Sequence, residues 1–350
     1  MNIIELVNLA TEKKASDIHI TVGRPPIFRI NGQLVVQETE RLMPDDTKRL
    51  VYETVNESLI DEFEKQGEID TSFASPGVGR YRVNAYKQRG SYGMALRIIP
   101  LEVPSMEELG LPKIVKELSR LPRGLILVTG PTGSGKSTTL ASMIDLINKE
   151  RSVHILTLED PIEYLHRHNL SMVNQREIGI DSQSFANSLR AALRQDPDVI
   201  LVGEMRDLET ISIALTAAET GHLVMSTLHT LGAAKTIDRV IDVFPPHQQQ
   251  QVRVQFASVL QSIISQQLLP KAKEKGRVAA FEIMIATTAI RNLIREEKIH
   301  QIDTAIQTGG KFQMQTMDSS LLDLYKRGII TKDTALSQAI NQDNIKKYIL

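Results

Sequence analysis

The sequence contains no cysteine and no tryptophan, and aromatic residues make up only 4% of its 350 residues. Without cysteine there can be no disulfide and no cysteine-ligated zinc site, which fits a reducing compartment. No apolar run approaches the roughly 20 residues that span a bilayer. The first residues include Glu5 where a signal peptide would carry basic residues. We therefore expect a cytoplasmic protein that associates with a membrane only peripherally, through partners.

The chain also lacks an excess of charge of either sign. It has 41 Lys and Arg against 42 Asp and Glu, which gives a formal net charge of −1. A balanced chain creates no global field that attracts nucleic acid, and few aromatic side chains are present on which bases could stack. We therefore expect no direct contact with nucleic acid. A ring-shaped nucleic-acid translocase remains the weaker alternative.

The order of the expected elements separates an N-terminal α+β part from a later α/β part. Helices are expected over 1–14 and 45–59, and strands form hairpins at Asn31-Gly32 and at Gly90. From Gly124 onward, short apolar strands alternate with helices, which is typical of a doubly wound, mainly parallel sheet. The predicted domains are residues 1–99 (α+β), a proline-punctuated linker over 100–123, an α/β domain over 124–288 and a helical region over 289–350.

A glycine-rich turn between a strand and a helix carries the strongest functional signal. The turn from Gly130 to Ser137 satisfies the P-loop pattern G-x-x-x-x-G-K-[ST]. Glycines let successive N–H groups point at a phosphate, and the helix N-terminus adds partial positive charge. Lys136 can then reach the β- and γ-phosphates of ATP, and the Ser137 hydroxyl can ligate Mg²⁺. The expected nucleotide-binding residues are Pro131, Thr132, Gly133, Ser134, Gly135, Lys136, Ser137 and Thr138.

Polar residues that follow other strands are candidates for catalysis, because ligands of such sheets sit at the carboxyl ends of the strands. Glu163 and Glu204 follow the strands that end at Leu158 and Val202. They are the candidates for orienting the attacking water and for holding Mg²⁺, the latter together with Ser137. His229, after a further strand, is a candidate sensor of the γ-phosphate. A solvated acidic turn and a structural histidine are the alternatives.

Phosphoryl transfer also needs positive charge, which arginine often supplies from a neighbouring subunit. Arg82 and Arg97 lie on expected strands before residue 100, where ordinary exposed arginines are the simpler interpretation. Arg206 and Arg239 lie in the α/β part and could act within the chain or across an interface. Residue type alone leaves these options open.

Residues 289–296 predict an amphipathic helix near the C-terminal side. Ile290 and Ile294 share one face with Leu293, whereas Arg291 and Arg295 lie one turn apart as a like-charge pair. The helix either packs on the α/β domain or presents a surface to a partner.

Six motifs in this order resemble those of the GspE/PilT family of secretion ATPases, and among them those of the retraction ATPases of bacterial type IV pili. Gly203 stands where many P-loop proteins carry aspartate, which is usual in that superfamily. The motifs are an N-terminal signature (15–20), the P-loop or Walker A motif (130–138), an Asp box (158–164), an atypical Walker B motif (198–207), a His box (221–230) and the motif of retraction ATPases (289–296).

The resemblance implies a PAS-like N-terminal domain, a RecA-like ATPase domain and a homohexameric ring. It implies a motor that hydrolyses ATP to retract pili and power twitching motility, acting on a PilC-like platform protein at the inner-membrane face. It assigns Glu163 as catalytic base and Glu204 to the Walker B role. It also implies that Arg82 and Arg97 reach the nucleotide, with Arg239 as a further candidate. Pilus-extension or type II secretion ATPases are the alternative. Those enzymes typically carry a tetracysteine zinc module, which a chain without cysteine cannot form.

Overall fold

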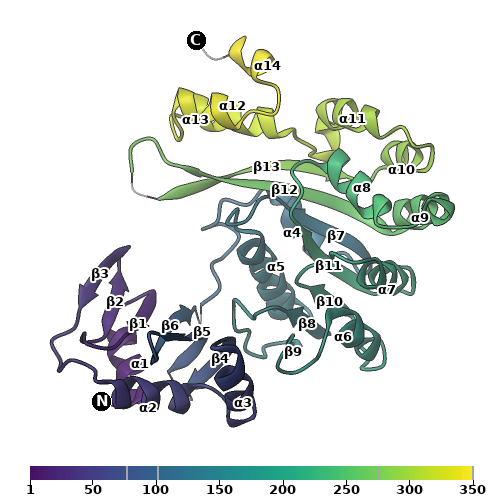
Figure 1. The fold of residues 1–350 in the computed structure, drawn as a ribbon. Helices are drawn as coiled ribbons and strands as arrows, with labels where there is room; N and C mark the ends of the chain where they lie inside the picture. The colour runs from purple at the N-terminus through teal and green to yellow at the C-terminus, as the bar shows by residue number, and fades with distance from the viewer. Residues whose placement is uncertain (76–77, 101, 275, 349–350) are drawn as a thin grey trace. The chain divides into compact units, whose positions relative to one another are not determined.

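The structure is a computed structural model that describes residues 1–75, 78–100, 102–274 and 276–348. Backbone contacts divide the chain into two compact units. The first comprises Met1–Glu102 together with Glu163–Leu165, and the second comprises Val103–Ile162 and His166–Leu350. Each unit is described by itself (Figure 1).

The first unit is built on a six-stranded sheet in the order β3-β2-β1-β6-β5-β4, in which every neighbouring pair is antiparallel. Three helices, α1 (Ile3–Glu12), α2 (Pro44–Thr54) and α3 (Glu57–Gln66), contribute apolar side chains such as Leu6, Leu50 and Phe63 to its core. The strands are β1 (Asp17–Ile20), β2 (Ile27–Ile30), β3 (Gln33–Val36), β4 (Glu68–Ser75), β5 (Gly79–Gln88) and β6 (Ser91–Ile99).

Both hairpins expected in this unit are confirmed. Asn31 and Gly32 join β2 to β3 with φ angles of 51° and 82°, and Arg89 and Gly90 join β5 to β6 with 51° and 75°. A two-residue type I′ turn needs positive φ at both central positions, a conformation that Asn and Gly tolerate. The turn residues therefore set the strand register here.

The single helix expected over 45–59 is wrong, because two helices occupy this stretch. Val55 is extended, with φ −80° and ψ 133°, and its side chain is buried. Asn56 then caps α3, since its Oδ1 accepts a hydrogen bond of 3.1 Å from the N–H of Ser58. The cap starts a new helix where the apolar pattern alone looked continuous.

The second unit is built on a seven-stranded sheet in the order β13-β12-β7-β11-β10-β8-β9, and it confirms the expected mainly parallel α/β fold. Only the β12–β13 pair, which forms a long hairpin, is antiparallel (Figure 1). The strands are β7 (Gly124–Thr129), β8 (His154–Glu159), β9 (Met172–Glu177), β10 (Val199–Val202), β11 (Leu223–Leu228), β12 (Leu260–Pro270) and β13 (Arg277–Ile285).

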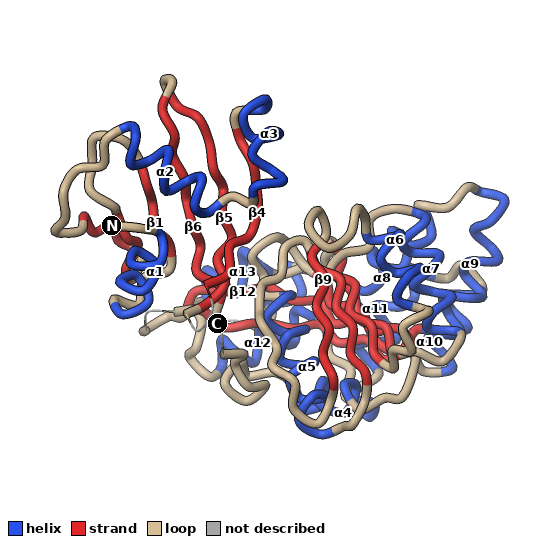
Figure 2. Tube along the Cα trace, turned by 90° about the horizontal axis from the view of Figure 1, so that it is seen from below, coloured by secondary structure: helices blue, strands red, loops and turns tan. Residues whose placement is uncertain are grey.

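Helices cover both faces of this sheet, as Figure 2 shows. Alternate residues of β7 reach opposite layers, so that Leu125 and Leu127 join one core and Ile126 and Val128 join another. Burial on both faces explains why the central strands are continuous apolar runs. One layer contains α4 (Lys113–Ser119) and α5 (Lys136–Glu150), and the other contains α6 (Phe185–Ala192), α7 (Leu208–Glu219), α8 (Ala233–Asp242), α9 (Pro246–Val259) and α10 (Thr288–Arg295).

The stretch over 100–123, expected to be a linker, includes part of the second unit. Ile114 and Val115 of α4 pack in the same core as Leu140 and Ile144 of α5. The change from one unit to the other falls between Glu102 and Val103. The prolines therefore precede and follow a packed helix instead of marking one long connection.

The region after 288 is helical, as expected, and α10 packs on α9 through Ile290 and Ile294. Among the described residues, no helix has the length and apolarity needed to cross a bilayer. The remaining helices are α11 (Ile302–Thr308), α12 (Met317–Lys326), α13 (Lys332–Gln338) and α14 (Gln342–Lys346), with short 3₁₀ turns at Ile299–Gln301 and Gly310–Phe312.

The Arg291 guanidinium donates hydrogen bonds to carbonyl oxygens instead of forming an ion pair with an acid. Its guanidinium donates to the backbone oxygens of Ala257 and Ser258, the latter at 2.7 Å, and to Gln261 Oε1 at 3.2 Å. These carbonyls lie at the C-terminal end of α9, where the helix dipole favours a cation. Arg291 therefore fastens α10 to α9.

We predict that Arg291→Met destabilises the protein by about 1–3 kcal/mol, because the carbonyls lose a charged donor. Thermal denaturation followed by circular dichroism should show a clear fall in the midpoint. The matched control is Arg295→Met, whose half-buried guanidinium donates to the side chain of Asn292 in the preceding turn of the same helix. It should change stability by less than about 0.5 kcal/mol. Equal effects of the two variants would contradict the role of Arg291.

Candidate active site

The carboxyl ends of four adjacent strands meet at one edge of the larger sheet. Their loops are joined by hydrogen bonds from Gly203 N–H to Leu158 O (2.7 Å) and from Gly130 N–H to Leu228 O (3.3 Å). The hydroxyl of Thr227 adds a bond of 2.6 Å to Gly203 O. The structure thus brings together the P-loop, the turn that carries Glu204 and the turn that carries His229.

The P-loop has the conformation that its glycines predict. Gly130, Gly133 and Gly135 have φ angles of 143°, 77° and 89°. A Cβ at Gly130 would lie 2.2 Å from the backbone oxygen of Gln266, whereas a Cβ at Gly133 would meet nothing within 4 Å. Gly130 is therefore required by close packing as well as by its dihedral angle.

Two polar groups of this loop suit a bound phosphate. Lys136 is 7% exposed, and its Nζ donates to Gly130 O (2.9 Å) and Pro131 O (3.1 Å). The Ser134 hydroxyl is buried and has no hydrogen-bond partner within the part of the chain that the structure describes. Buried polar groups are normally satisfied. An anion in the loop would accept bonds from both side chains.

Glu204 and His229 lie beside the loop as one polar cluster. The Oε1 atom of Glu204 contacts Arg206 Nε and lies 3.5 Å from His229 Nε2. On its other side, His229 Nδ1 lies 3.4 Å from the Thr132 hydroxyl. Because a carboxylate only accepts, the His229 tautomer with the proton on Nε2 satisfies both neighbours.

Partial desolvation and two nearby cations favour the neutral form of His229, whose side chain is 40% exposed. Loss of solvent lowers the pKa of His229 below its usual 6.5, and the charges of Lys136 and Arg206 lower it further. The imidazole is therefore uncharged near pH 7, so it can donate from one nitrogen while it accepts at the other.

Three of the predicted residues belong to the first unit. Glu163 is exposed and falls within the segment Glu163–Leu165. Arg82 and Arg97 face each other on β5 and β6, both exposed, and Arg97 Nε donates to Asp17 Oδ1 at 3.0 Å. Arg239, in the second unit, is exposed in the last turn of α8. The roles of these four residues stay predictions.

Gln266 and Thr139 were missed by the sequence reading. Gln266, on β12, donates to Ser134 O (2.6 Å) and accepts from the Thr139 hydroxyl (2.8 Å). The one available signal was a pair of glutamines between the apolar residues of an unrecognised strand.

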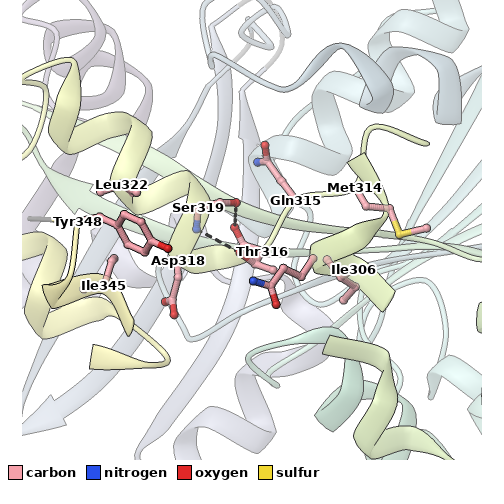
Figure 3. A pocket seen from close by; sticks show the side chains of 10 residues that line it. Ile306, Met314, Gln315, Thr316, Asp318, Ser319, Leu322, Ile345 and Tyr348 are labelled. Atoms are coloured by element: carbon pink, nitrogen blue, oxygen red, sulfur yellow. Dashed lines mark hydrogen bonds between the residues drawn. The ribbon is translucent and has the colours of Figure 1, made fainter. Parts of the chain in front are cut away.

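A pocket of about 210 Å³ lies elsewhere in the second unit, among the C-terminal helices (Figure 3). Apolar side chains such as Met314, Leu322 and Tyr348 line much of it. Its acid, Asp318, accepts hydrogen bonds from the N–H groups of Ile340 and Asn341 at 2.8 and 3.0 Å, and so caps a chain turn. None of the predicted site residues lines this pocket.

Within the described residues, no three His, Asp or Glu side chains gather into a ready metal site. Mg²⁺ beside phosphates is usually held by one or two protein ligands together with phosphate oxygens and water.

A parallel sheet with a P-loop after one of its central strands, and with acid and histidine side chains at the same edge, defines a P-loop nucleotide-binding protein. The chain belongs to the family of type II/IV secretion system proteins, whose model matches residues 2–331. The resemblance stated from the motifs is thereby confirmed.

Several known proteins are similar to this chain over most of its length. The type IV pilus retraction ATPase PilT of Pseudomonas aeruginosa is 52% identical over 98% of this chain and 100% of its own length. A twitching motility protein of Neisseria gonorrhoeae is 48% identical over 91% of this chain and 86% of its own. The crystal structure of the pilus retraction motor PilT with bound ADP matches with a TM-score of 0.93, at 52% identity, over 99% of both chains.

We predict that Gly130→Ala disrupts the phosphate-binding loop, because the new methyl group would overlap the carbonyl of Gln266. The affinity for a fluorescent ADP analogue, measured by titration, should fall at least about tenfold, in line with the cost of overpacking. Gly133→Ala is the matched control for folding. Its methyl group enters open space, so the only cost is that of a positive φ, about 1–2 kcal/mol. A Gly130→Ala variant with normal affinity and melting temperature would contradict this account.

Proposed function

We propose that this protein is a motor ATPase that couples ATP hydrolysis to the retraction of type IV pili and so to twitching motility. The observation that carries the proposal is the 52% identity to a pilus retraction ATPase over its whole length, in a chain whose P-loop is intact. The polar cluster around Glu204 and His229 supports hydrolysis instead of mere nucleotide binding.

The P-loop would bind ATP by exchanging internal bonds for phosphate. Lys136 would leave the carbonyls of Gly130 and Pro131 and contact the β- and γ-phosphates, with the residues from Pro131 to Thr138 around them. Ser137 and Glu204 would hold Mg²⁺, for which Glu204 has to release Arg206. When bound, the cation neutralises charge on the phosphate oxygens.

Hydrolysis needs an oriented water and a base. We assign the base role to Glu163: it would accept a proton as the water oxygen bonds to the γ-phosphorus and the bond from that phosphorus to the bridging oxygen breaks. His229 would donate its Nε2 proton toward a γ-phosphate oxygen once Glu204 has turned to the cation. The neutral state of His229 suits this exchange.

The arginines Arg82, Arg97 and Arg239 would supply counter-charge, from the N-terminal domain or from a neighbouring subunit. Arg97 is held by Asp17 in this structure. Burial alone would raise the pKa of Asp17, but hydrogen bonds from Arg97 and Ser16 keep it below its usual value. Recruitment of Arg97 to a nucleotide would thus break a charged pair, and a phosphate is a strong enough acceptor to replace it.

The working assembly would be a homohexamer of the PAS-like domain (1–99) and the RecA-like domain (124–288), with the C-terminal helical region. It would act on a PilC-like platform protein at the cytoplasmic face of the inner membrane. Nucleotide can drive such a motor only if it binds one arrangement of the domains better than another.

The proposed base makes a sharp prediction. Glu163→Gln should keep ATP affinity within about threefold of wild type, because the side chain is not needed for binding, and should lower the steady-state rate by about 10²–10⁴. Lys136→Ala is the contrasting variant, which should lose both. Phosphate release and fluorescent-nucleotide binding report the two properties separately. Near-normal turnover by Glu163→Gln would remove this residue from the role of base.

Deletion of the gene in a piliated host separates retraction from its alternatives. We expect loss of twitching with an excess of surface pili, since assembly continues without disassembly. Loss of pili would point to an extension ATPase, and stimulation of the purified ATPase by nucleic acid would favour a translocase. Electron microscopy of pili, with the Lys136→Ala allele as a control that retains the protein, provides the measurement.

A further inference from the structure

One buried glutamine, from a strand far away in the sequence, is hydrogen-bonded to the P-loop. Gln266, on β12, is 3% exposed. Its Nε2 donates to the backbone oxygen of Ser134 at 2.6 Å, and its Oε1 accepts from the hydroxyl of Thr139 at 2.8 Å. One amide group thus joins the turn of the loop to the first turns of α5.

The two bonds fix which way the amide faces. A backbone oxygen only accepts and so needs the NH₂ group, which leaves the amide oxygen for the Thr139 hydroxyl. Among side chains of this length, glutamine has the donor and the acceptor that the site requires at neutral pH. A Cβ at Gly135 would lie 2.8 Å from Gln266 Nε2, so the loop is packed against this amide.

The bond to Ser134 has a consequence for the next N–H group. The carbonyl of Ser134 and the N–H of Gly135 belong to one planar peptide unit, and in a trans peptide they point in opposite directions. Because Gln266 holds the carbonyl toward β12, the Gly135 N–H is directed away from β12.

We propose that Gln266 is a positioning residue for nucleotide binding: it holds the Ser134–Gly135 peptide so that the Gly135 N–H is aimed at the phosphate. The inference rests on the proposed nucleotide site. Gln266 contacts the loop through Ser134 and Thr139, so its effect should appear in nucleotide affinity and should depend on its hydrogen-bond donor.

The neighbouring residue provides a matched control. Gln267 is also buried, at 4% exposure, and its Nε2 lies 3.5 Å from the backbone oxygen of Gln338 in the C-terminal helical region. Successive residues of a strand point to opposite faces of the sheet. The same substitution at Gln267 therefore places an acid at equal burial on the other side of β12.

The experiment compares Gln266→Glu with Gln267→Glu in the full-length protein, by titration with a fluorescent ADP analogue at about pH 8 and about pH 6. An ionised carboxyl at position 266 cannot donate to Ser134 O, so the dissociation constant at the higher pH should rise about tenfold or more over wild type. Burial raises the pKa of a carboxyl. As the pH falls, protonation of the carboxyl restores an O–H donor. The dissociation constant of Gln266→Glu should then exceed that of wild type by only about threefold. Gln267→Glu should stay within about threefold of wild type at both pH values.

Three outcomes would each overturn the assignment. Gln266→Glu could bind the analogue with wild-type affinity at the higher pH, or the two variants could lose equal affinity. The third is a loss of affinity in Gln266→Glu that does not change with pH. Failure of the wild-type protein to bind the analogue would instead overturn the proposed function, and this inference with it. The two failures are therefore distinguishable.

A second pair of variants applies if Gln266→Glu does not fold. Thr139→Val removes the hydroxyl that anchors Gln266 Oε1, and Thr139→Ser keeps it. We expect the valine variant to bind the analogue several-fold more weakly than the serine variant, with similar circular dichroism spectra. Equal affinities of the valine and serine variants would overturn the proposal.

Discussion

The contact on which this structure depends is the approach of Gly130 to the backbone of β12. Any side chain at that position would meet the Gln266 oxygen at 2.2 Å, so only glycine lets the phosphate-binding loop close there. β12 is placed by its parallel pairing with β7 on one side and its hairpin with β13 on the other. The strand order of the sheet therefore shapes the loop as much as the glycine pattern does.

The polar side chains around the loop contact one another or the loop backbone. Lys136 donates to loop carbonyls, Glu204 accepts from Arg206, and His229 bridges Glu204 and Thr132. Each of these groups therefore has a polar partner in the absence of nucleotide, which avoids the free-energy cost of a buried, unpartnered charge. The proposed binding of a nucleotide would exchange these partners for phosphate oxygens and the cation.

Much of the fold followed from short patterns. The Asn31-Gly32 turn, the run before Gly130 and the acid after Val202 each depend on neighbours within a few residues, and the structure places them as expected. Other features did not follow. The break at Val55 depends on burial of its side chain. The strands β4 and β9 mix polar with apolar residues at the edges of their sheets, and β12 carries glutamines that meet polar partners. The catalytic roles proposed for Glu163, Arg82, Arg97 and Arg239 still rest on the family resemblance.

The amino-acid sequence by itself determined that this chain forms a phosphate-binding loop between a buried strand and a helix, because glycine, lysine and serine act there through local backbone geometry. Only the tertiary structure decided which side chain packs against that loop and holds its backbone. Gln266 and Ser134 are 132 positions apart in the chain, and they meet because β12 pairs with β7. A hydrogen bond over such a separation is set by strand order, and strand order comes from the packing of the whole sheet.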